Sequence, residues 1–223
     1  MNFDFSSEDR MIQEQVRRFL SEQSPLSRHR SVMEGQSLQA SEVWRGLADL
    51  GLQGTAISEA YGGVGAGYLP LCLVAQELGG VLAAVPFSSS VYLATEAILC
   101  FGSTEQKERY LPKLASGEWV GTCAVSEGPQ APSPTNLTVT RSGNTVSGKK
   151  LVVPHGLVAD FAIVLVASDA GTDLVLAGLE GVERSAVEIV DPTIAAATID
   201  FAQTHCESLG EPGDGWAMLE TLQ

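Results

Sequence analysis

The sequence is poor in positive charge and has no long apolar run. Thirteen basic residues stand against 27 acidic ones, for a formal net charge of −14, and no Lys/Arg cluster exceeds two residues. Because nucleic-acid-binding surfaces are built from basic patches, we predict no nucleic-acid partner. The apolar stretch 161–167 has the length of a buried strand, so we predict no transmembrane helix either.

Cysteine and histidine are also scarce, which limits redox and metal chemistry. No C-x-x-C pair occurs, no Cys/His set has metal-ligand spacing, and the chain does not open with the basic and apolar regions of a signal peptide. We therefore predict a reduced, cytoplasmic protein without a metal site. The residues concerned are Cys72, Cys100, Cys123, Cys206, His29, His155 and His205.

Apolar residues make up 44% of the 223 positions, which is enough for one large or two ordinary domains. The first part of the chain has helical periodicity. Ser6-x-x-Asp9 resembles a capping box, and apolar residues then recur at helical spacing, which predicts a helix over 7–22. Residues 26–39 are polar and are predicted to be irregular.

Further helices are expected up to residue 118. Ser41 is predicted to cap a second helix, with Gly51 in the left-handed conformation just past its end. The glycine-rich segment 59–67 matches neither phosphate-binding glycine spacing, so we interpret it as a plain connecting loop. The remaining helices, over 68–82, 89–101 and after the capping box at Ser103-x-x-Gln106, complete a bundle of about five helices.

Beyond Trp119 the period changes to two. No helical pattern separates the apolar segments, so a parallel Rossmann-type sheet is disfavoured and a small antiparallel β-barrel or sandwich is favoured. Strands are predicted at 137–140, 145–146, 151–153, 161–167, 174–177, 187–190 and 197–201.

The fold class is therefore α+β, with several domains. The predicted divisions are a helical domain (1–118), a β-barrel domain (119–208) and a linker with the start of another helix (209–223). That last helix would line up Trp216, Leu219 and Leu222 on one apolar face, and it is too short to be stable without docking. The stretch 110–127 joins the two larger domains, where ligand clefts are common.

Five motifs now point to a family. In order, they are Ala-Tyr-Gly-Gly-Val-Gly-Ala at 60–66, Tyr-Leu-Pro-Lys-Leu-Ala-Ser-Gly-Glu at 110–118, Ala-Val-Ser-Glu at 124–127, Ser-Gly-Lys-Lys with Ala-Asp at 147–160, and Leu-Gly-Glu-Pro-Gly-Asp-Gly at 209–215. Together they resemble the acyl-CoA dehydrogenase family. The resemblance implies a third part, a C-terminal helical bundle that pairs subunits. It also implies that the family's catalytic glutamate lies beyond Gln223, so no catalytic residue is assigned here.

The resemblance implies α,β-dehydrogenation of an acyl-CoA thioester with FAD as cofactor. A carboxylate takes the α proton, the flavin receives a hydride from the β carbon, and an electron-transfer flavoprotein reoxidises the flavin. Such enzymes serve β-oxidation of fatty acids or of steroid side chains, and the complete protein would be a homo- or hetero-oligomer.

By position, the resemblance places Cys123, Val125 and Ser126 against the flavin or the acyl chain, with the Ser126 hydroxyl bonded to the flavin and near the substrate. An alternative for Ser126 is a hydrogen bond to its own backbone. Val152 stands where the family has an aromatic residue that shields the flavin, and Pro154 where a Thr or Ser contacts it.

The loop 128–134 departs from the family's glycine-rich pattern. It contains three prolines, among them Pro132 at a substrate-binding position, and proline removes a backbone donor. His155 follows where Asn is common, and we interpret it as a satisfied loop residue. Glu127 borders the presumed cleft, but the resemblance gives it a structural role at the turn.

Three hypotheses follow. The chain is part of a FAD-dependent enzyme whose bundle lies outside these residues. Alternatively, it is a non-catalytic partner subunit of a hetero-oligomeric dehydrogenase, which has lost flavin contacts at Pro132, Val152 and Pro154. A free-standing scaffold protein is the third possibility, and it requires Trp216 and its neighbours to be buried within this chain.

Overall fold

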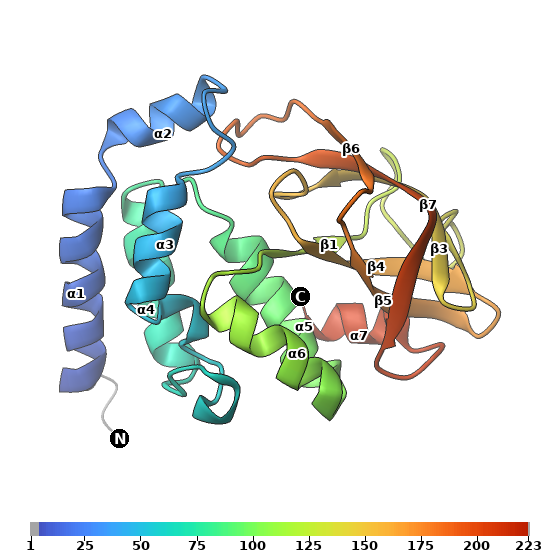
Figure 1. The fold of residues 1–223 in the computed structure, drawn as a ribbon, viewed down its shortest axis with the longest axis horizontal. Helices are drawn as coiled ribbons and strands as arrows, with labels where there is room; N and C mark the ends of the chain where they lie inside the picture. The colour runs from blue at the N-terminus through green and yellow to red at the C-terminus, as the bar shows by residue number, and fades with distance from the viewer. Residues whose placement is uncertain (1–4, 223) are drawn as a thin grey trace.

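The computed structural model describes residues 5–222, and its helical part precedes its β part along the chain (Figure 1). Six α-helices and three other helical segments lie within residues 5–118. They are α1 (Ser7–Gln23), α2 (Leu26–Met33), α3 (Ser41–Asp49), α4 (Tyr68–Gly80), α5 (Glu96–Phe101), α6 (Thr104–Ala115), the 3₁₀ turns η1 (Leu52–Gly54) and η2 (Glu59–Tyr61), and the π-helical segment η3 (Ser88–Thr95).

Both predicted capping boxes are confirmed. The backbone N–H of Asp9 donates to Ser6 Oγ at 3.1 Å, and the backbone N–H of Ser6 donates to the Asp9 carboxylate at 3.0 Å. The same reciprocal pair joins Ser103 and Gln106 at the start of α6. These local hydrogen bonds satisfy donors that the first helical turn leaves unpaired, which is why the sequence signature works.

Two predictions in this region, an irregular segment 26–39 and a cap at Ser41, are wrong. Residues 26–39 contain α2, which buries only His29 and Val32, so its apolar pattern is too sparse to read from the sequence. Ser41 is the first residue of α3, while Ala40 occupies the N-cap position without a side-chain bond. Gly51 has φ of +73°, as predicted for the residue that ends this helix.

The glycine-rich segment is a connecting loop, as predicted. Backbone N–H groups from residue 63 to residue 67 donate to carbonyls of residues 54 to 58, at distances between 2.8 and 3.2 Å. Donors used in this way are not free to hold a phosphate group. The segment therefore folds onto the chain just before it.

The β part is a seven-stranded sheet in which β4, β2, β3, β7 and β5 form a closed ring, because β5 pairs with β4. β1 is added on β4 and β6 on β7. The strands are β1 (Gly121–Ala124), β2 (Thr140–Ser142), β3 (Thr145–Val153), β4 (Phe161–Ser168), β5 (Gly171–Gly178), β6 (Glu183–Ala186) and β7 (Ala197–Leu209).

The predicted barrel is confirmed, with three corrections. β1 and β2 both run parallel to β4, so the sheet is not wholly antiparallel. The predicted strand at 187–190 is irregular, and Val190 is fully exposed, so its apolar residues have no core to face. The predicted strand at 137–140 begins only at its last residue.

The helical part and the barrel meet at β1. The backbone N–H of Gly121 donates to Ser90 Oγ in η3 at 3.2 Å, and Phe161 of β4 packs edge-on against Tyr110 of α6 with ring centroids 4.8 Å apart. Buried side chains from both parts form continuous clusters across this joint. The two predicted domains therefore share a core where β1 passes between them.

The last helix, α7 (Gly215–Thr221), docks on the barrel. The backbone N–H of Trp216 donates to Thr172 Oγ1 at 3.0 Å, and that of Gly213 donates to the Asp173 carboxylate at 2.8 Å. Met218 and Leu219 are buried. Docking supplies the stability that so short a helix lacks alone.

The close approach at Gly121 gives a stability prediction. A Cβ there would lie 2.7 Å from the Phe161 ring and also against Ala94, so we expect Gly121→Ala to lower the free energy of unfolding by about 1–3 kcal/mol. The matched control is Gly128→Ala, where a Cβ would meet nothing within 4 Å. Urea unfolding measures both, and equal values for the two variants would contradict the tight joint.

Candidate functional site

A cavity of about 300 Å³ opens between β1, the end of β3, η3 and α7, and we call it the β1 slot. All five positions that the sequence assigned to cofactor contact line it, although they come from two separate segments of the chain. Its lining residues are Leu93, Cys123, Val125, Ser126, Val152, Pro154, Leu219 and Leu222. The volume is at the low end for small-molecule sites, and the lining is mostly apolar, as such sites are.

Backbone pairing brings the two segments together. The backbone N–H of Leu151 donates to the carbonyl of Ser126 at 2.8 Å, which continues the contact between the β1 segment and β3. The Thr122 hydroxyl donates to the carbonyl of Pro154 at 2.6 Å. Val152 and Pro154 are thereby held opposite Cys123 and Ser126.

A buried ion pair reinforces this arrangement. The Lys150 side chain is fully buried, and its Nζ lies 2.6 Å from Glu127 Oε1 and 3.0 Å from the carbonyl of Val125. Burial lowers the pKa of Lys150, and the Glu127 carboxylate opposes that shift. Charges this deep are tolerated only when they are paired and hydrogen-bonded.

Glu127 serves the fold rather than the slot. Its carboxylate also accepts from the hydroxyl of Thr138 at 2.7 Å and from the backbone N–H groups of Thr138 and Val139. Burial raises its pKa, but the hydrogen bonds from Lys150 and Thr138 outweigh this and hold the pKa below its usual value. A carboxylate with so many donors is a poor proton acceptor, as its predicted structural role requires.

The polar group available in the slot is the Ser126 hydroxyl. Within residues 5–222 it makes no hydrogen bond, so the alternative of a bond to its own backbone is not realised. It can therefore donate to, or accept from, a ring heteroatom. Burial raises the pKa of the Cys123 thiol to about 12, so Cys123 contributes an apolar, protonated wall.

Val152 and Pro154 offer a flavin fewer contacts than the aromatic residue and the Thr or Ser that the family has at these positions. Val152 is 46% exposed and has φ of +52°, an unusual conformation for a β-branched residue. Pro154 has no N–H, and its carbonyl is already used by Thr122. The slot therefore fits the face of a flat apolar ring with one hydroxyl contact, but it supplies no stacking ring and no second hydroxyl.

Pro132 lies apart from the other predicted site residues. It lines a separate cavity of about 350 Å³ with Glu127, Gly128 and Thr138. Glu127 stands between this cavity and the slot, since it directly follows Ser126. The structure thus brings together five of the six predicted positions, and the substrate-binding role of Pro132 stays a prediction.

His155 has a partner that the sequence did not reveal. Its Nδ1 lies 3.0 Å from Ser89 Oγ in η3, 66 residues away in the chain, and both side chains are buried. The Ser89 hydroxyl also lies 3.2 Å from the carbonyl of Pro86. The pair is enclosed, so it is a satisfied buried contact and not an accessible nucleophile with its base.

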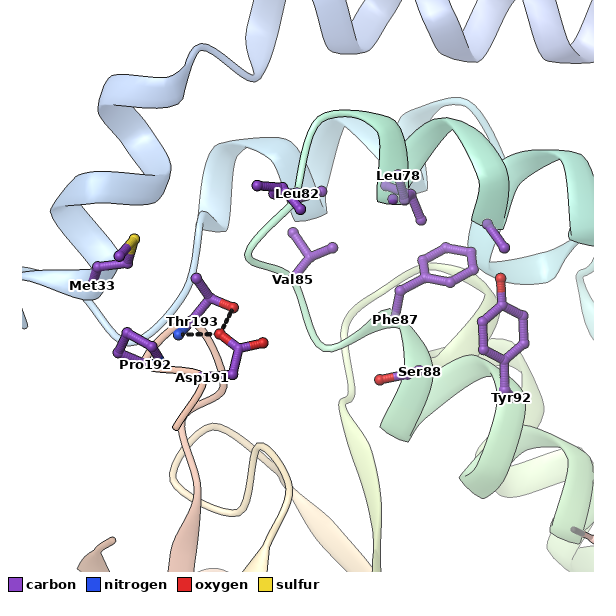
Figure 2. Close-up of a pocket in the computed structure, with 13 residues that line it drawn as sticks. Met33, Leu78, Leu82, Val85, Phe87, Ser88, Tyr92, Asp191, Pro192 and Thr193 are labelled. Carbon is purple, nitrogen blue, oxygen red and sulfur yellow. Dashed lines mark hydrogen bonds between the residues drawn. The ribbon is translucent and has the colours of Figure 1, made fainter. Parts of the chain in front are cut away.

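A second cavity, of about 440 Å³, lies between α4, η3 and the loop before β7, and we call it the α4–η3 cavity (Figure 2). Figure 2 shows Leu78, Leu82 and Phe87 on one side of it and Asp191 to Thr193 on the other. The sequence alone does not reveal this cavity, because its walls combine Met33, residues 75–92 and residues 191–193, which are distant in the chain.

The chain is similar to proteins of known family over most of its length. A family model described as "Acyl-CoA dehydrogenase, N-terminal domain" matches residues 6–118, half of the chain. The chain belongs to the acyl-CoA dehydrogenase family. Mitochondrial isovaleryl-CoA dehydrogenase of Pongo abelii is 33% identical over 171 residues, which cover 74% of this chain and 40% of that protein.

Two solved structures extend the match over the barrel. A variant of the Tcur3481-Tcur3483 steroid ACAD has 28% identity and a TM-score of 0.84, covering 96% of this chain and 60% of that one. The ChsE4-ChsE5 complex from Mycobacterium tuberculosis has 25% identity and a TM-score of 0.84, covering 100% and 61%. The chain spans about two fifths of the length of the curated relatives it matches.

Residues 5–222 contain neither a metal-ligand cluster nor a membrane-spanning helix. No group of three or more His, Cys, Asp or Glu side chains there could hold a metal ion. None of the helices there is long and apolar enough to cross a membrane.

The ion pair gives a second stability prediction. Glu127→Gln leaves the Lys150 ammonium buried without its counter-ion, so we expect the free energy of unfolding to fall by about 3 kcal/mol. The control is Asp200→Asn, which breaks the more exposed pair with Lys149 and should cost less than about 1 kcal/mol. Denaturant unfolding compares them, and a loss for Glu127→Gln no larger than the control's would show that the buried pair is dispensable.

His155 gives a pH prediction. Burial lowers the pKa of its imidazole from 6.5 to about 4, against a smaller opposing effect of Asp191. Between these two pH values the unfolded chain binds a proton that the folded protein does not. Stability contributed by His155 therefore falls as the pH is lowered through that window, by about 3 kcal/mol in full. His155→Asn should lose this component, so the difference in unfolding free energy between wild type and variant should shrink from pH 7 to pH 4.5; a constant difference would contradict it.

Proposed function

We propose that this chain forms the flavin-facing side of an acyl-CoA dehydrogenase, which removes the α and β hydrogens of an acyl-CoA thioester. The observation that carries the proposal is the β1 slot, where Cys123, Val125, Ser126, Val152 and Pro154 line one cavity. These are the positions that the family resemblance assigns to the flavin. Bound FAD would supply the hydride acceptor.

The chain's own residues would bind, orient and exclude water. The Ser126 hydroxyl would hold a ring heteroatom of the cofactor, and Leu93, Val125 and Leu219 would keep the slot dry. The Lys150–Glu127 pair would fix the two sides of the slot relative to each other. The α proton would go to a carboxylate from outside these residues, because Glu127 is committed to its hydrogen bonds.

A second candidate is a partner subunit that keeps the fold without holding flavin. Val152 and Pro154 favour it, because neither can replace the aromatic ring and the hydroxyl that the family places there. The similarity to a protein described as the ChsE4-ChsE5 complex is in keeping with a two-chain assembly. In this candidate the chain would complete the site of a sister subunit.

The proposed substrate is an acyl-CoA thioester, and the proposed electron acceptor is an electron-transfer flavoprotein. Both candidate functions, the enzyme and the partner subunit, are compatible with a role in β-oxidation of fatty acids or steroid side chains. We also infer a homo- or hetero-oligomer, in keeping with the similarity to the ChsE4-ChsE5 complex. The four free cysteines support a reducing, cytoplasmic environment.

Flavin titration tests both candidates. The protein is mixed with FAD, and binding is followed by quenching of flavin fluorescence and by the visible spectrum. We expect Val152→Trp with Pro154→Thr to tighten FAD binding at least about tenfold, because an added ring stacks on the cofactor and an added hydroxyl bonds to it. The control is Val64→Trp, an exposed valine on the helical part that lines neither cavity.

The outcomes separate the candidates. Flavin binding by the wild type, tightened in the double variant, supports the enzyme. Binding by the double variant alone supports the partner subunit. Equal binding by the double variant and the Val64→Trp control would show that the β1 slot is not the flavin site, which would remove the basis of both.

A further inference from the structure

The start of α7 is capped by a different part of the chain. Asp214 stands at its N-cap position, yet in the described part of the chain the Asp214 side chain makes no capping hydrogen bond. The backbone N–H groups of Gly213 and Trp216 donate instead to Asp173 and Thr172. The first residues of β5 therefore do for α7 what an N-cap side chain does for other helices.

Both acceptors on β5 are buried and held in place. Thr172 and Asp173 are 5% and 4% exposed. The Asp173 carboxylate also accepts from Arg141 Nη1 at 3.1 Å, and Arg141 Nε donates to the carbonyl of Gly143 at 2.8 Å. Because a buried carboxylate is stable only when it is paired in this way, Asp173 is a fixed acceptor for the start of α7.

α7 also lies directly on the β5 backbone (Figure 1). A Cβ at Gly215, the first residue of α7, would lie 2.4 Å from the carbonyl carbon of Asp173. No side chain fits between these two stretches of backbone, so glycine at this position allows the close approach.

The position of α7 determines one wall of the β1 slot, which Leu219 and Leu222 line. In a helix of seven residues, every side chain lies within about two turns of the start, so a shift there moves the wall as well. Leu219 belongs to the same buried cluster as Cys123 of β1, which also lines the slot.

We propose that Thr172 and Asp173 are positioning residues of the β1 slot: they hold the start of α7 on the barrel, and through it the leucine wall of the slot. Neither residue lines the slot, so both act through α7 and not on a bound molecule. The consequence for flavin binding rests on the proposed function, whereas the position of the wall can be measured without flavin.

Thiol labelling of the full chain without added flavin tests the proposal. Cys123 is 8% exposed, and burial raises its pKa to about 12, so it should react slowly with iodoacetamide while α7 is docked. Cys206 of β7 is 1% exposed and reports opening of the barrel instead. Mass spectrometry of peptides gives the labelling rate of each thiol separately.

Two variants weaken the seat of α7 by different means. Thr172→Val keeps the shape of the side chain but leaves the Trp216 N–H without its acceptor. Gly215→Ala prevents the close approach to β5, although alanine favours a helix. In each we expect Cys123 to be labelled at least about fivefold faster than in the wild type, with the rate at Cys206 changed by less than about twofold.

Two conservative variants grade the effect. Thr172→Ser keeps the hydroxyl and should restore the wild-type labelling rate of Cys123. Asp173→Asn keeps an oxygen that can accept from Gly213 but loses the charge that pairs with Arg141, so its rate should lie between those of wild type and Thr172→Val.

Thr145→Val and Gly178→Ala are the matched controls. The first removes a hydroxyl that donates to the carbonyl of Ser142, and the second adds a methyl group at the other end of β5, where a Cβ meets nothing within 4 Å. Neither should change the labelling of Cys123. Equal acceleration at Cys123 and Cys206, or no acceleration in either Thr172→Val or Gly215→Ala, would overturn the proposal.

Flavin titration of the same variants connects the wall to the proposed function. Thr172→Val and Gly215→Ala should weaken FAD binding by at least about fivefold, and Thr172→Ser should not. If Cys123 is selectively exposed in these variants while FAD binds as in the wild type, the slot is not the flavin site, and the proposed function fails while the positioning role stands. If FAD binding weakens without selective exposure of Cys123, the positioning role fails instead.

Discussion

The β1 slot depends on one buried contact, the ion pair between Lys150 and Glu127. Burial of a full ammonium group is costly, and here the cost is offset by a carboxylate at 2.6 Å and a backbone carbonyl at 3.0 Å. The contact ties β3 to the segment that follows β1. Together with the backbone hydrogen bond from Leu151 to Ser126, this tie positions the side chains that the two segments contribute to the slot, so a polar interaction helps to shape an otherwise apolar site.

Local signals in the sequence predicted much of the fold. The capping boxes at Ser6 and Ser103 and the apolar run of β4 are short-range features, and each lies where it was expected. The predictions failed where the structure of a segment depends on packing against residues that are distant in the chain. α2 buries only two residues, and 187–190 is apolar yet has no partner strand, so neither could be recognised from its own composition.

The site was predictable only in part, and through family resemblance. That resemblance picked the five residues in and just after β1 and β3 that share the slot, because their motifs are contiguous in sequence. Leu93, Leu219 and Leu222 were not predicted as lining residues, since helices distant in the chain supply them. The Ser89–His155 contact and the positive φ of Val152 are likewise products of tertiary structure, which no single motif encodes.

The anchoring of α7 has a thermodynamic consequence. Leu219 and Leu222 form one wall of the slot, yet the helix that carries them is held at its start by hydrogen bonds to Thr172 and Asp173. A molecule that fills the slot must favour the docked helix over the frayed one, and by reciprocity a docked helix must favour retention of that molecule. Occupancy of the cavity and protection of the α7 amides from hydrogen exchange should therefore increase together, because both depend on the same docking equilibrium.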